Sequence, residues 1–265
     1  MRVRLPFRKP KPLVAVVRLS GAIGMAGRGS LNADTLAPVL EKAFRKGKPV
    51  AVALEINSPG GSPVQSSLIG AHIRRLADEL DIPVIGFVED VAASGGYWLA
   101  AAADEIWADD SSVIGSIGVI SASFGLDVLL ERQGVDRRVY TAGDSKSMLD
   151  PFKPEKPEDV ARLKQLLEDI HGNFIAHVKD RRGDKLSTEQ NLFNGEVWLA
   201  KRATELGLIE GVGHLNPLMK DRYGDKVQFR RYGQRRSLLS RFGASIVQDA
   251  VAGIEERAAY ARFGL

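Results

Sequence analysis

Apolar runs of strand length alternate with amphipathic stretches of helix length along the first third of the chain, and this alternation restricts the fold more than any other feature. Buried-strand patterns lie at 12–24, 48–61 and 82–90, and helical patterns lie between them at 32–47 and 62–80. Strands that alternate with helices are typical of an α/β fold with mostly parallel strands. In such folds, functional residues gather at the carboxyl ends of the strands.

Shorter elements continue the pattern beyond residue 90. A third helix is expected to begin near Ser94. The later predictions are two short strands within 104–120, a helix at 124–134, a strand at 135–143, a long helix at 156–183, and a helix, turn and strand at 198–213. The remainder, from about residue 216, is basic and ends in a helical pattern at 244–263.

Composition excludes several classes of protein. The chain has no cysteine, so it has neither disulfides nor thiolate chemistry. A net charge of +4 is too small to indicate nucleic-acid binding by itself. No signal peptide and no apolar run of membrane-spanning length is found, so we expect a soluble, cytoplasmic protein. Basic residues gather at 1–12 and 229–242, which indicates either solvated tails or contact with an anionic membrane surface on its cytoplasmic face.

The sequence motifs do not indicate a nucleotide-binding or a metal-binding site. Four glycines follow the first strand, at positions 21, 24, 27 and 29, but their spacing is not the G-x-G-x-x-G of a dinucleotide site. The four histidines, at 72, 171, 177 and 214, form no metal-ligand spacing. We therefore expect chemistry that needs no metal and no cofactor.

The turn "NSPGG" at 57–61 follows the second strand pattern. Pro59 fixes one backbone angle, whereas Gly60 and Gly61 allow conformations that other residues avoid. Backbone N–H groups without a neighbouring Cβ can approach a ligand and stabilise an oxyanion. The alternative is a plain turn between a strand and a helix.

Ser94 lies in "AASGG", between the third strand and the third helix. A helix N-terminus offers free N–H groups and the positive end of the helix dipole, which would stabilise an alkoxide or an oxyanion. Ser94 is therefore either a nucleophile or a simple N-cap.

A nucleophilic serine needs a base, and no histidine lies in the strand and turn segments after Ser94. Lys146 lies in one of these segments, "TAGDSKSMLDPF", close in sequence to Met148, Leu149 and Phe152. Apolar neighbours lower the pKa of a lysine by desolvation and make it a general base, whereas a solvated loop lysine has no such role.

Three segments together resemble the signal peptide peptidase A (SppA) family: "INSPGG", "AASGGYWLAAAADEIWADDSSVIGSIGV" and "AGDSKSMLDPF", in the family's order and approximate spacing. "GEVWLAKRATELGLIE", at 195–210, is also similar to that family. The resemblance covers about residues 13–215. It divides the chain into a basic tail at 1–12, a protease domain at 13–215 and a basic C-terminal extension with a terminal helix at 216–265.

The resemblance implies a serine protease with a Ser/Lys dyad on a ClpP/crotonase-like α/β fold of repeated β-β-α units. By matching motifs, Ser94 is the nucleophile, Lys146 the general base, and the N–H groups of Gly61 and Gly95 the oxyanion hole. The segment "GSIGV" would pair with an extended peptide substrate. The implied substrate-binding residues are Gly60, Ser116, Ile117, Gly118 and Val119.

Family resemblance also implies an assembly. Single-copy members form rings, in some of which the dyad is completed across subunits, so we expect a homo-oligomer. Many members carry an N-terminal membrane anchor, which is not found in this sequence. The extension is open to three interpretations: a docking helix, a basic amphipathic membrane anchor, or a tail that occupies a substrate groove.

The first hypothesis is a serine endopeptidase that degrades signal peptides or other apolar peptides. A crotonase-like acyl-CoA enzyme is the second, because that fold also builds an oxyanion hole from two backbone N–H groups. A non-catalytic, membrane-associated scaffold is the third.

Overall fold

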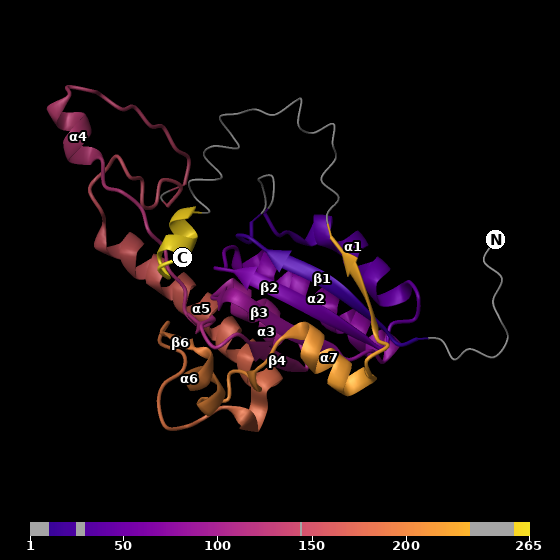
Figure 1. Cartoon of the computed structure of the whole chain (residues 1–265). Coiled ribbons are helices and arrows are strands. Elements are labelled where there is room, and N and C mark those ends of the chain that lie inside the picture. The colour runs from indigo at the N-terminus through magenta and orange to yellow at the C-terminus, as the bar shows by residue number, and fades with distance from the viewer. Residues whose placement is uncertain (1–10, 25–29, 144, 234–256) are drawn as a thin grey trace.

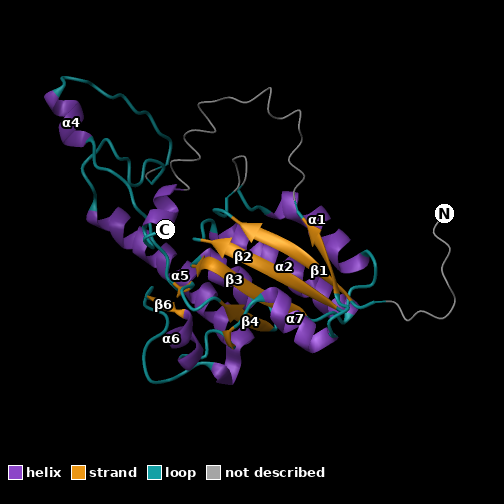
Figure 2. Cartoon of the chain, in the orientation of Figure 1, coloured by secondary structure: helices purple, strands orange, loops and turns teal. Residues whose placement is uncertain are grey.

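The structure is a computed structural model, and it describes residues 11–24, 30–143, 145–233 and 257–265. An eight-stranded sheet forms its centre, with the strand order β6-β5-β3-β2-β1-β8; β4 also pairs with β3, and β7 pairs with β4. Helices cover both faces of this sheet (Figures 1 and 2). The α/β class and the predominance of parallel strands are confirmed, because every pairing except that of β5 with β6 is parallel.

Three long strands form the middle of the sheet: β1 (Leu13–Ser20), β2 (Ala51–Ser58) and β3 (Val84–Ala93). They run in parallel and are almost entirely buried, which explains their nearly continuous apolar sequences. Their carboxyl ends, at Ser20, Ser58 and Ala93, lie at the same edge of the sheet.

Helices after each strand return the chain across one face. They are α1 (Ala33–Arg45), α2 (Pro63–Leu80) and the short α3 (Gly95–Ala101). Side-chain oxygens cap the first two: Asn32 accepts from the Thr35 N–H, and Ser62 accepts from the Gln65 N–H.

Side chains of the central strands point alternately to two apolar cores, as strand geometry requires. On one face, Val17 and Leu54 pack with residues of α1, α2 and α3. On the other face, Val14 and Ala53 pack with Leu215 of α7 (Leu215–Tyr223). The sheet is thus enclosed on both sides, and its carboxyl edge remains available for a site.

Short strands extend the sheet on either side of β3. The first half of β3 pairs with β4 (Glu105–Ala108), and its second half pairs with β5 (Val113–Gly115). Beyond them lie β6 (Val197–Leu199), the helix α6 (Ala200–Glu205) and β7 (Gly211–Val212). The two strands predicted within 104–120 and the elements predicted at 198–213 are confirmed.

Part of the region that the sequence assigns to the extension lies in the sheet itself. β8 (Gln228–Tyr232) pairs in parallel with β1, and α7 covers one face of the same sheet. The predicted terminal helix at 244–263 lies mostly outside the described residues; its last part, 257–261, is helical.

A projecting segment, residues 120–143 and 145–156, leaves the body of the molecule and is called the arm below (Figure 1). It carries α4 (Asp127–Arg132), which confirms the predicted helix there. The strand predicted at 135–143 is wrong: these residues are irregular and largely exposed. An isolated strand is not stable without a partner that satisfies its backbone groups, and the arm offers none among its described residues.

The long helix predicted at 156–183 is confirmed as α5 (Pro157–Arg182), which connects the arm to the body. The short 3-10 turn η1 (Gly183–Lys185) follows it. The buried side chains of α5, Phe174, Val178 and Arg182, lie in its second half, which packs near α3. In the described part of the chain, no helix combines the length and the apolar character needed to cross a membrane.

Candidate active site

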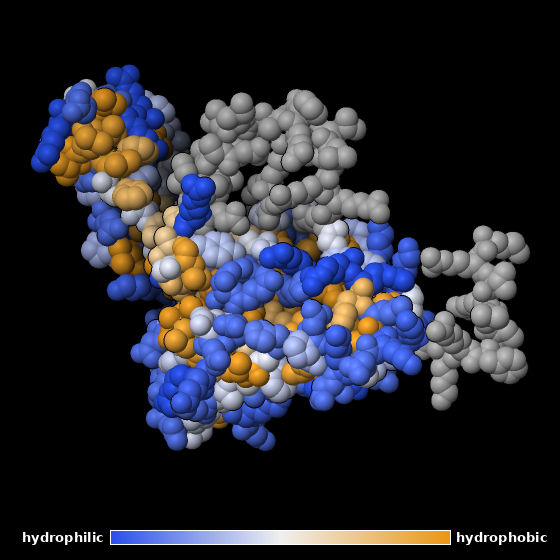
Figure 3. All heavy atoms as spheres, viewed as in Figure 1, coloured by the Kyte–Doolittle hydropathy of each residue, from blue (hydrophilic) through white to orange (hydrophobic). Residues whose placement is uncertain are grey.

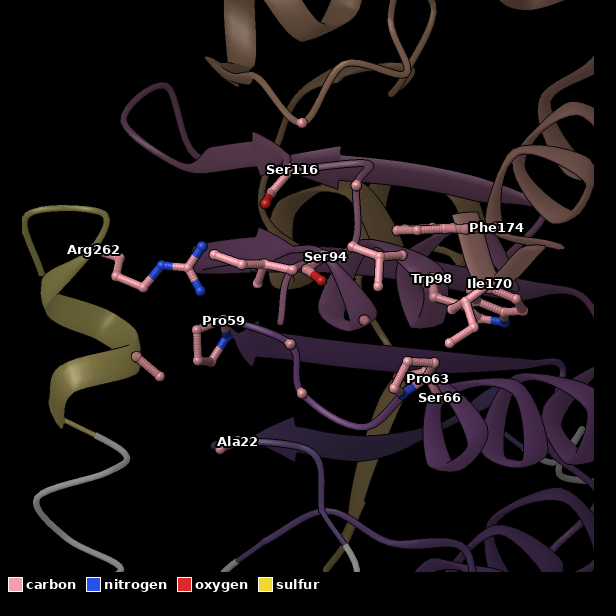
Figure 4. A pocket seen from close by; sticks show the side chains of 18 of the residues that line it. Ala22, Pro59, Pro63, Ser66, Ser94, Trp98, Ser116, Ile170, Phe174 and Arg262 are labelled. Atoms are coloured by element: carbon pink, nitrogen blue, oxygen red, sulfur yellow. The ribbon is translucent and has the colours of Figure 1, made fainter. Parts of the chain in front are cut away.

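A cleft of about 450 Å³ lies at the carboxyl edge of the sheet, where β1, β2 and β3 end. Ser94 faces this cleft from the start of α3 (Figure 4). The turn residues Gly60, Gly61 and Gly95 line the same cleft, so the structure brings together three glycines and the serine that sequence patterns had singled out separately.

The backbone of Ser94 has a rare conformation, with φ of 53° and ψ of −124°. A non-glycine residue with positive φ is uncommon, and strained backbone conformations cluster at functional sites. Hydrogen bonds hold it in place: the Ser94 N–H donates to the Gly115 carbonyl oxygen at 2.8 Å, and its own carbonyl accepts from Tyr97 and Trp98. The peptide groups are therefore fixed while the side chain projects into the cleft.

The hypothesis that Ser94 is a simple helix cap can be checked directly. Ser94 occupies the N-cap position of α3, but its side chain forms no capping hydrogen bond with the described residues. By contrast, Asn32 and Ser62 cap their helices through their side chains. The geometry of Ser94 therefore favours a free hydroxyl over a structural cap.

Gly95 and Gly96 allow α3 to start directly against its neighbours. A Cβ on Gly96 would overlap the Ser58 carbonyl oxygen of β2, and a Cβ on Gly95 would overlap the Ser66 hydroxyl of α2. The two glycines therefore let α3 pack closer to β2 and α2 than any side chain would permit. The absence of a Cβ at Gly95, which lines the cleft, also leaves room for a substrate.

The Pro59–Gly60–Gly61 turn faces the start of α3. The Gly60 carbonyl accepts from the Ile23 N–H, and the Ile23 carbonyl accepts from the Ser62 N–H, both at 2.8 Å. These two bonds leave the intervening Gly61 N–H on the opposite side of the turn, because successive peptide groups of an extended chain alternate. On that side, the Gly61 nitrogen lies 3.4 Å from the position that a Cβ on Gly95 would occupy.

Two backbone donors therefore lie beside Ser94. The Gly95 N–H is the first of its helix and has no acceptor within α3, and the Gly61 N–H has no described acceptor in the turn. Donors arranged in this way can stabilise an oxygen that becomes negatively charged.

The segment after β5 forms the opposite wall, where Ser116, Gly118 and Val119 line the cleft. Ile117 does not: it is fully buried, and its carbonyl accepts a hydrogen bond from His171 Nε2 at 3.1 Å. β5 itself ends at Gly115, so the predicted strand at "GSIGV" is shorter than expected.

Lys146 lies elsewhere. It is exposed in a turn of the arm, and it is not among the residues that line the cleft. Met148 and Leu149 are half-buried beside it, but they do not cover the Lys146 side chain. Within one chain, the structure does not bring Lys146 and Ser94 into the same cleft.

Sequence patterns missed the apolar end of the cleft, which Trp98 forms together with Ile170 and Phe174 of α5 (Figure 4). The Trp98 and Phe174 rings lie 5.0 Å apart, and His177 stacks on Trp98 at 4.5 Å. Residues 170, 174 and 177 share one face of a helix, so this spacing was the available signal.

His177 also binds the backbone of α3, because its Nε2–H donates to the Trp98 carbonyl oxygen at 3.0 Å. Burial lowers the pKa of the His177 imidazole, and the nearby Arg181 acts in the same direction. Arg181 donates to the carbonyls of Ala101 and Ala103, and Arg74 donates to that of Ala102. The carboxyl end of α3 is thus held by cationic side chains, which its dipole favours.

Comparison with known proteins agrees with this architecture. The model of peptidase family S49 matches residues 77–224, which is more than half of the chain. The fold resembles that of the membrane-bound stomatin-specific protease 1510-N, whose solved structure is that of a mutant, with a TM-score of 0.50 and 17% identity over 86% of this chain and all of that one. The ClpP/crotonase-like fold is confirmed.

Two relatives match most of this chain in sequence. A Brucella abortus protein named Na(+)/H(+) antiporter NhaA is 48% identical over 98% of this chain, and the match covers 38% of that protein. The chloroplastic serine protease SPPA of Arabidopsis thaliana is 33% identical over 77% of this chain, which covers 31% of the plant protein. The chain thus spans about a third of the length of these relatives.

The antiporter name is given to a protein much longer than the matched region, whereas the family match lies within this chain. The family match and the protease relative agree on the family of this chain. The chain belongs to peptidase family S49 and is a relative of the SppA proteases.

Proposed function

We propose that this chain is a serine endopeptidase in which Ser94 attacks the carbonyl carbon of a peptide bond. One observation carries the proposal: the Ser94 hydroxyl is unbonded among the described residues, sits on a strained backbone and faces a cleft between two glycine turns. A serine that served only the fold would use its hydroxyl as a cap or relax its backbone.

The oxyanion hole of this enzyme consists of the Gly61 and Gly95 N–H groups. Both N–H groups lie next to Ser94 and lack a described acceptor in their own turns. Because hydrogen bonds elsewhere fix both turns, the donors need no rearrangement when charge develops on the carbonyl oxygen.

Lys146 of a neighbouring subunit is the general base. Two features support a base that comes from another copy of the chain. Lys146 is exposed on the arm, away from the cleft of its own chain, and no charged side chain other than that of Arg262 lines the cleft among the described residues. A lysine that enters this cleft loses water, which lowers its pKa and favours the neutral form.

The arm is the element that would reach the neighbour. None of the described residues from 118 to 173 is buried within the chain, and Figure 3 shows apolar side chains gathered on the arm around α4. Its most exposed apolar residues are Ile120, Phe124, Val128, Leu129, Val135 and Tyr140. Apolar surface of this kind marks an interaction site, here with a second copy in a homo-oligomeric ring.

The reaction then proceeds in two stages. Neutral Lys146 takes the proton of the Ser94 hydroxyl as its oxygen attacks the peptide carbonyl, and Gly61 and Gly95 stabilise the resulting oxyanion. The Lys146 ammonium returns that proton to the leaving amine. Water, deprotonated in turn by Lys146, hydrolyses the acyl-enzyme and frees Ser94.

Peptides with apolar side chains, among them cleaved signal peptides, are the proposed substrates. Trp98, Ile170 and Phe174 give the cleft an apolar end that fits such a side chain. Gly60, Ser116, Gly118 and Val119 line the walls along which an extended backbone would lie, with Ile117 supporting them from below.

The proposed contact with an anionic membrane surface depends on the two basic clusters, of which the structure describes only a part. Residues 1–10 and 234–256 lie outside the described residues, and they contain most of the basic clusters. Arg231, at the start of the second cluster, pairs with Glu55 in β2. The described part of that cluster therefore already has one structural role.

The acyl-CoA hypothesis gains no support from the cleft, because no carboxylate lines it among the described residues. A scaffold function explains neither the strain nor the open hydroxyl at Ser94. The deciding experiment is cleavage of a fluorogenic peptide library by wild type and by Ser94→Ala. We expect cleavage by wild type alone, and equal activity of the two proteins would contradict the proposal.

A further inference from the structure

The segment at 257–265 forms one end of the cleft, opposite the apolar end at Trp98. Ala259, Arg262 and Phe263 line the cleft together with Ser94 (Figure 4). A hydrogen bond attaches this segment to the sheet, since the Tyr260 hydroxyl donates to the Asn57 carbonyl oxygen at 2.7 Å. Residues more than 150 positions apart in sequence thus meet at the carboxyl edge of β2.

Asn57 lies just before the Ser58–Gly61 turn. Its carbonyl also accepts from the Gly21 N–H at 2.9 Å, so the strand end that holds Tyr260 is itself fixed. The 257–265 segment is therefore tied to the same strand that leads into the Gly61 turn. Its side chains have a defined position relative to Ser94.

Arg262 differs from everything else in the cleft. It is the one charged residue among the described residues that line the cleft. Its Cζ lies 5.9 Å from the Phe263 ring centroid, and none of the ion pairs among the described residues includes it. Figure 4 shows its guanidinium directed from the helix across the cleft toward Ser94. A guanidinium that contacts an aromatic ring and has no carboxylate partner among the described residues keeps its N–H donors for a ligand in the cleft.

We propose that Arg262 is a specificity-determining residue that binds a carboxylate of the peptide substrate at this end of the cleft. The guanidinium presents paired N–H donors that match the two oxygens of a carboxylate. The carboxylate is either an acidic side chain or the free C-terminus of a peptide. The proposal rests on the peptidase function above.

The two ends of the cleft together determine which peptides are favoured as substrates. An apolar side chain enters beside Trp98 and Phe174, and the carboxylate meets Arg262 on the far side of Ser94. Two such anchors fix the register of an extended peptide across the serine. Apolar peptides that carry an acidic group at one fixed distance from the scissile bond are therefore the favoured substrates.

Binding can be tested apart from catalysis by using the full chain with Ser94→Ala. The probes are fluorescent apolar peptides that carry Glu at successive positions, the matched peptides with Gln, and the same peptides with a free or an amidated C-terminus. We expect the carboxylate form to bind about threefold to tenfold more tightly at one position only. The gain should shrink as salt is raised, because an exposed ion pair is screened.

Arg262→Gln should abolish this gain, and Arg262→Glu should reverse it in favour of Lys at the same position. Arg257→Gln is the matched control, since Arg257 is exposed on the same segment but does not line the cleft. Tyr260→Phe should reduce the gain without a change in charge, because it removes the bond to Asn57.

Equal affinity for the acidic and amide peptides, including no binding of either, would overturn the proposal. An Arg262→Gln protein that binds every peptide more tightly, by the same factor, would also overturn it, because this result would show that the segment merely covers the cleft. Failure of the peptidase function gives a different pattern: no cleavage by the wild type, with the Glu-to-Gln difference in binding retained.

Discussion

The Ser94 N–H donates a 2.8 Å hydrogen bond to the Gly115 carbonyl oxygen, which joins the turn after β3 to the end of β5. Both residues have positive φ, 53° at Ser94 and 116° at Gly115. Only at Ser94 is positive φ strained, because glycine adopts it freely. The bond therefore holds the strained Ser94 turn against the start of the segment that forms the opposite wall of the cleft. It also fixes the serine relative to the segment at 116–119, along which a substrate would lie.

Gly96→Ala should destabilise the protein by about 1–3 kcal/mol, because the added methyl would overlap the Ser58 carbonyl oxygen and force α3 away from β2. Peptidase activity should fall by more than the folded fraction does, since α3 carries Ser94. Urea denaturation and peptide cleavage on the same preparation measure the two effects.

Gly172→Ala is the control for this substitution. Gly172 lies in α5, and a Cβ there meets nothing within 4 Å. Alanine is the better helix former, so stability should rise by about 0.5–1 kcal/mol with activity unchanged. A Gly96→Ala protein as stable as wild type would show that α3 does not need its close packing on β2.

Ser94→Ala and Lys146→Ala should each be inactive, and a mixture should regain activity if the dyad is shared between subunits. In a randomly mixed ring, a site is complete when one subunit keeps Ser94 and its neighbour keeps Lys146. With equal amounts this holds for about a quarter of sites, so about a quarter of wild-type activity is expected after subunit exchange.

The control is a mixture of the Ser94→Ala protein with the double variant, which should stay inactive. No recovery in the first mixture, despite demonstrated exchange of subunits, would locate the base within the chain that carries Ser94. It would also require the arm to fold back over its own cleft.

Local signals in the sequence were sufficient for the glycine turns and for Ser94. Gly60, Gly61 and Gly95 follow strands whose patterns are clear, and parallel strands bring their carboxyl ends together. The strand predicted at 135–143 failed because strand formation needs a partner, and no local pattern shows whether one exists.

Contacts between distant segments could not be predicted for a similar reason. The pairing of β8 with β1 and the approach of Arg262 to the cleft depend on where residues 215–233 and 257–265 meet the sheet. Tertiary packing determines these contacts, and the basic composition of the region does not predict them. The position of Lys146 likewise depends on where the whole arm lies relative to the body, which its local sequence does not show.

Replacement of Phe124 and Tyr140 by Asp should disrupt the assembly, because both side chains are over four-fifths exposed on the arm and are apolar or aromatic. Light scattering after size exclusion should report a multiple of 28.8 kDa for wild type and a shift toward 28.8 kDa for the variant. Activity should fall with it, because Lys146 lies on the same arm.

Leu68→Asp is the control for the arm variant, since Leu68 is an exposed apolar residue of α2 outside the arm. It should leave the mass unchanged. A wild-type mass of 28.8 kDa at working concentration would contradict both the ring and the shared dyad.

His177 makes stability depend on pH in a range where few other groups titrate. Burial holds the pKa of its imidazole below the ordinary value of 6.5; Arg181 acts in the same direction, and the hydrogen bond to the Trp98 carbonyl and the charge of Asp180 oppose it. The unfolded chain therefore takes up the proton first as the pH falls. Stability from this residue is fully present above pH 6.5 and is lost as the pH falls below it toward the lowered folded-state pKa.

His177→Gln removes the titrating group and can keep a donor for the Trp98 carbonyl. We expect wild type to lose more stability than this variant when the pH is lowered from about 7 to about 5, measured by urea denaturation. Carboxylates contribute little there, since a group such as Glu41, with its pKa lowered to about 2 by Arg45, stays charged in the folded state and titrates near pH 4.5 only when unfolded. His214→Gln, at a largely exposed histidine, should follow wild type, and identical slopes for all three proteins would show that His177 is not buried against α3 in solution.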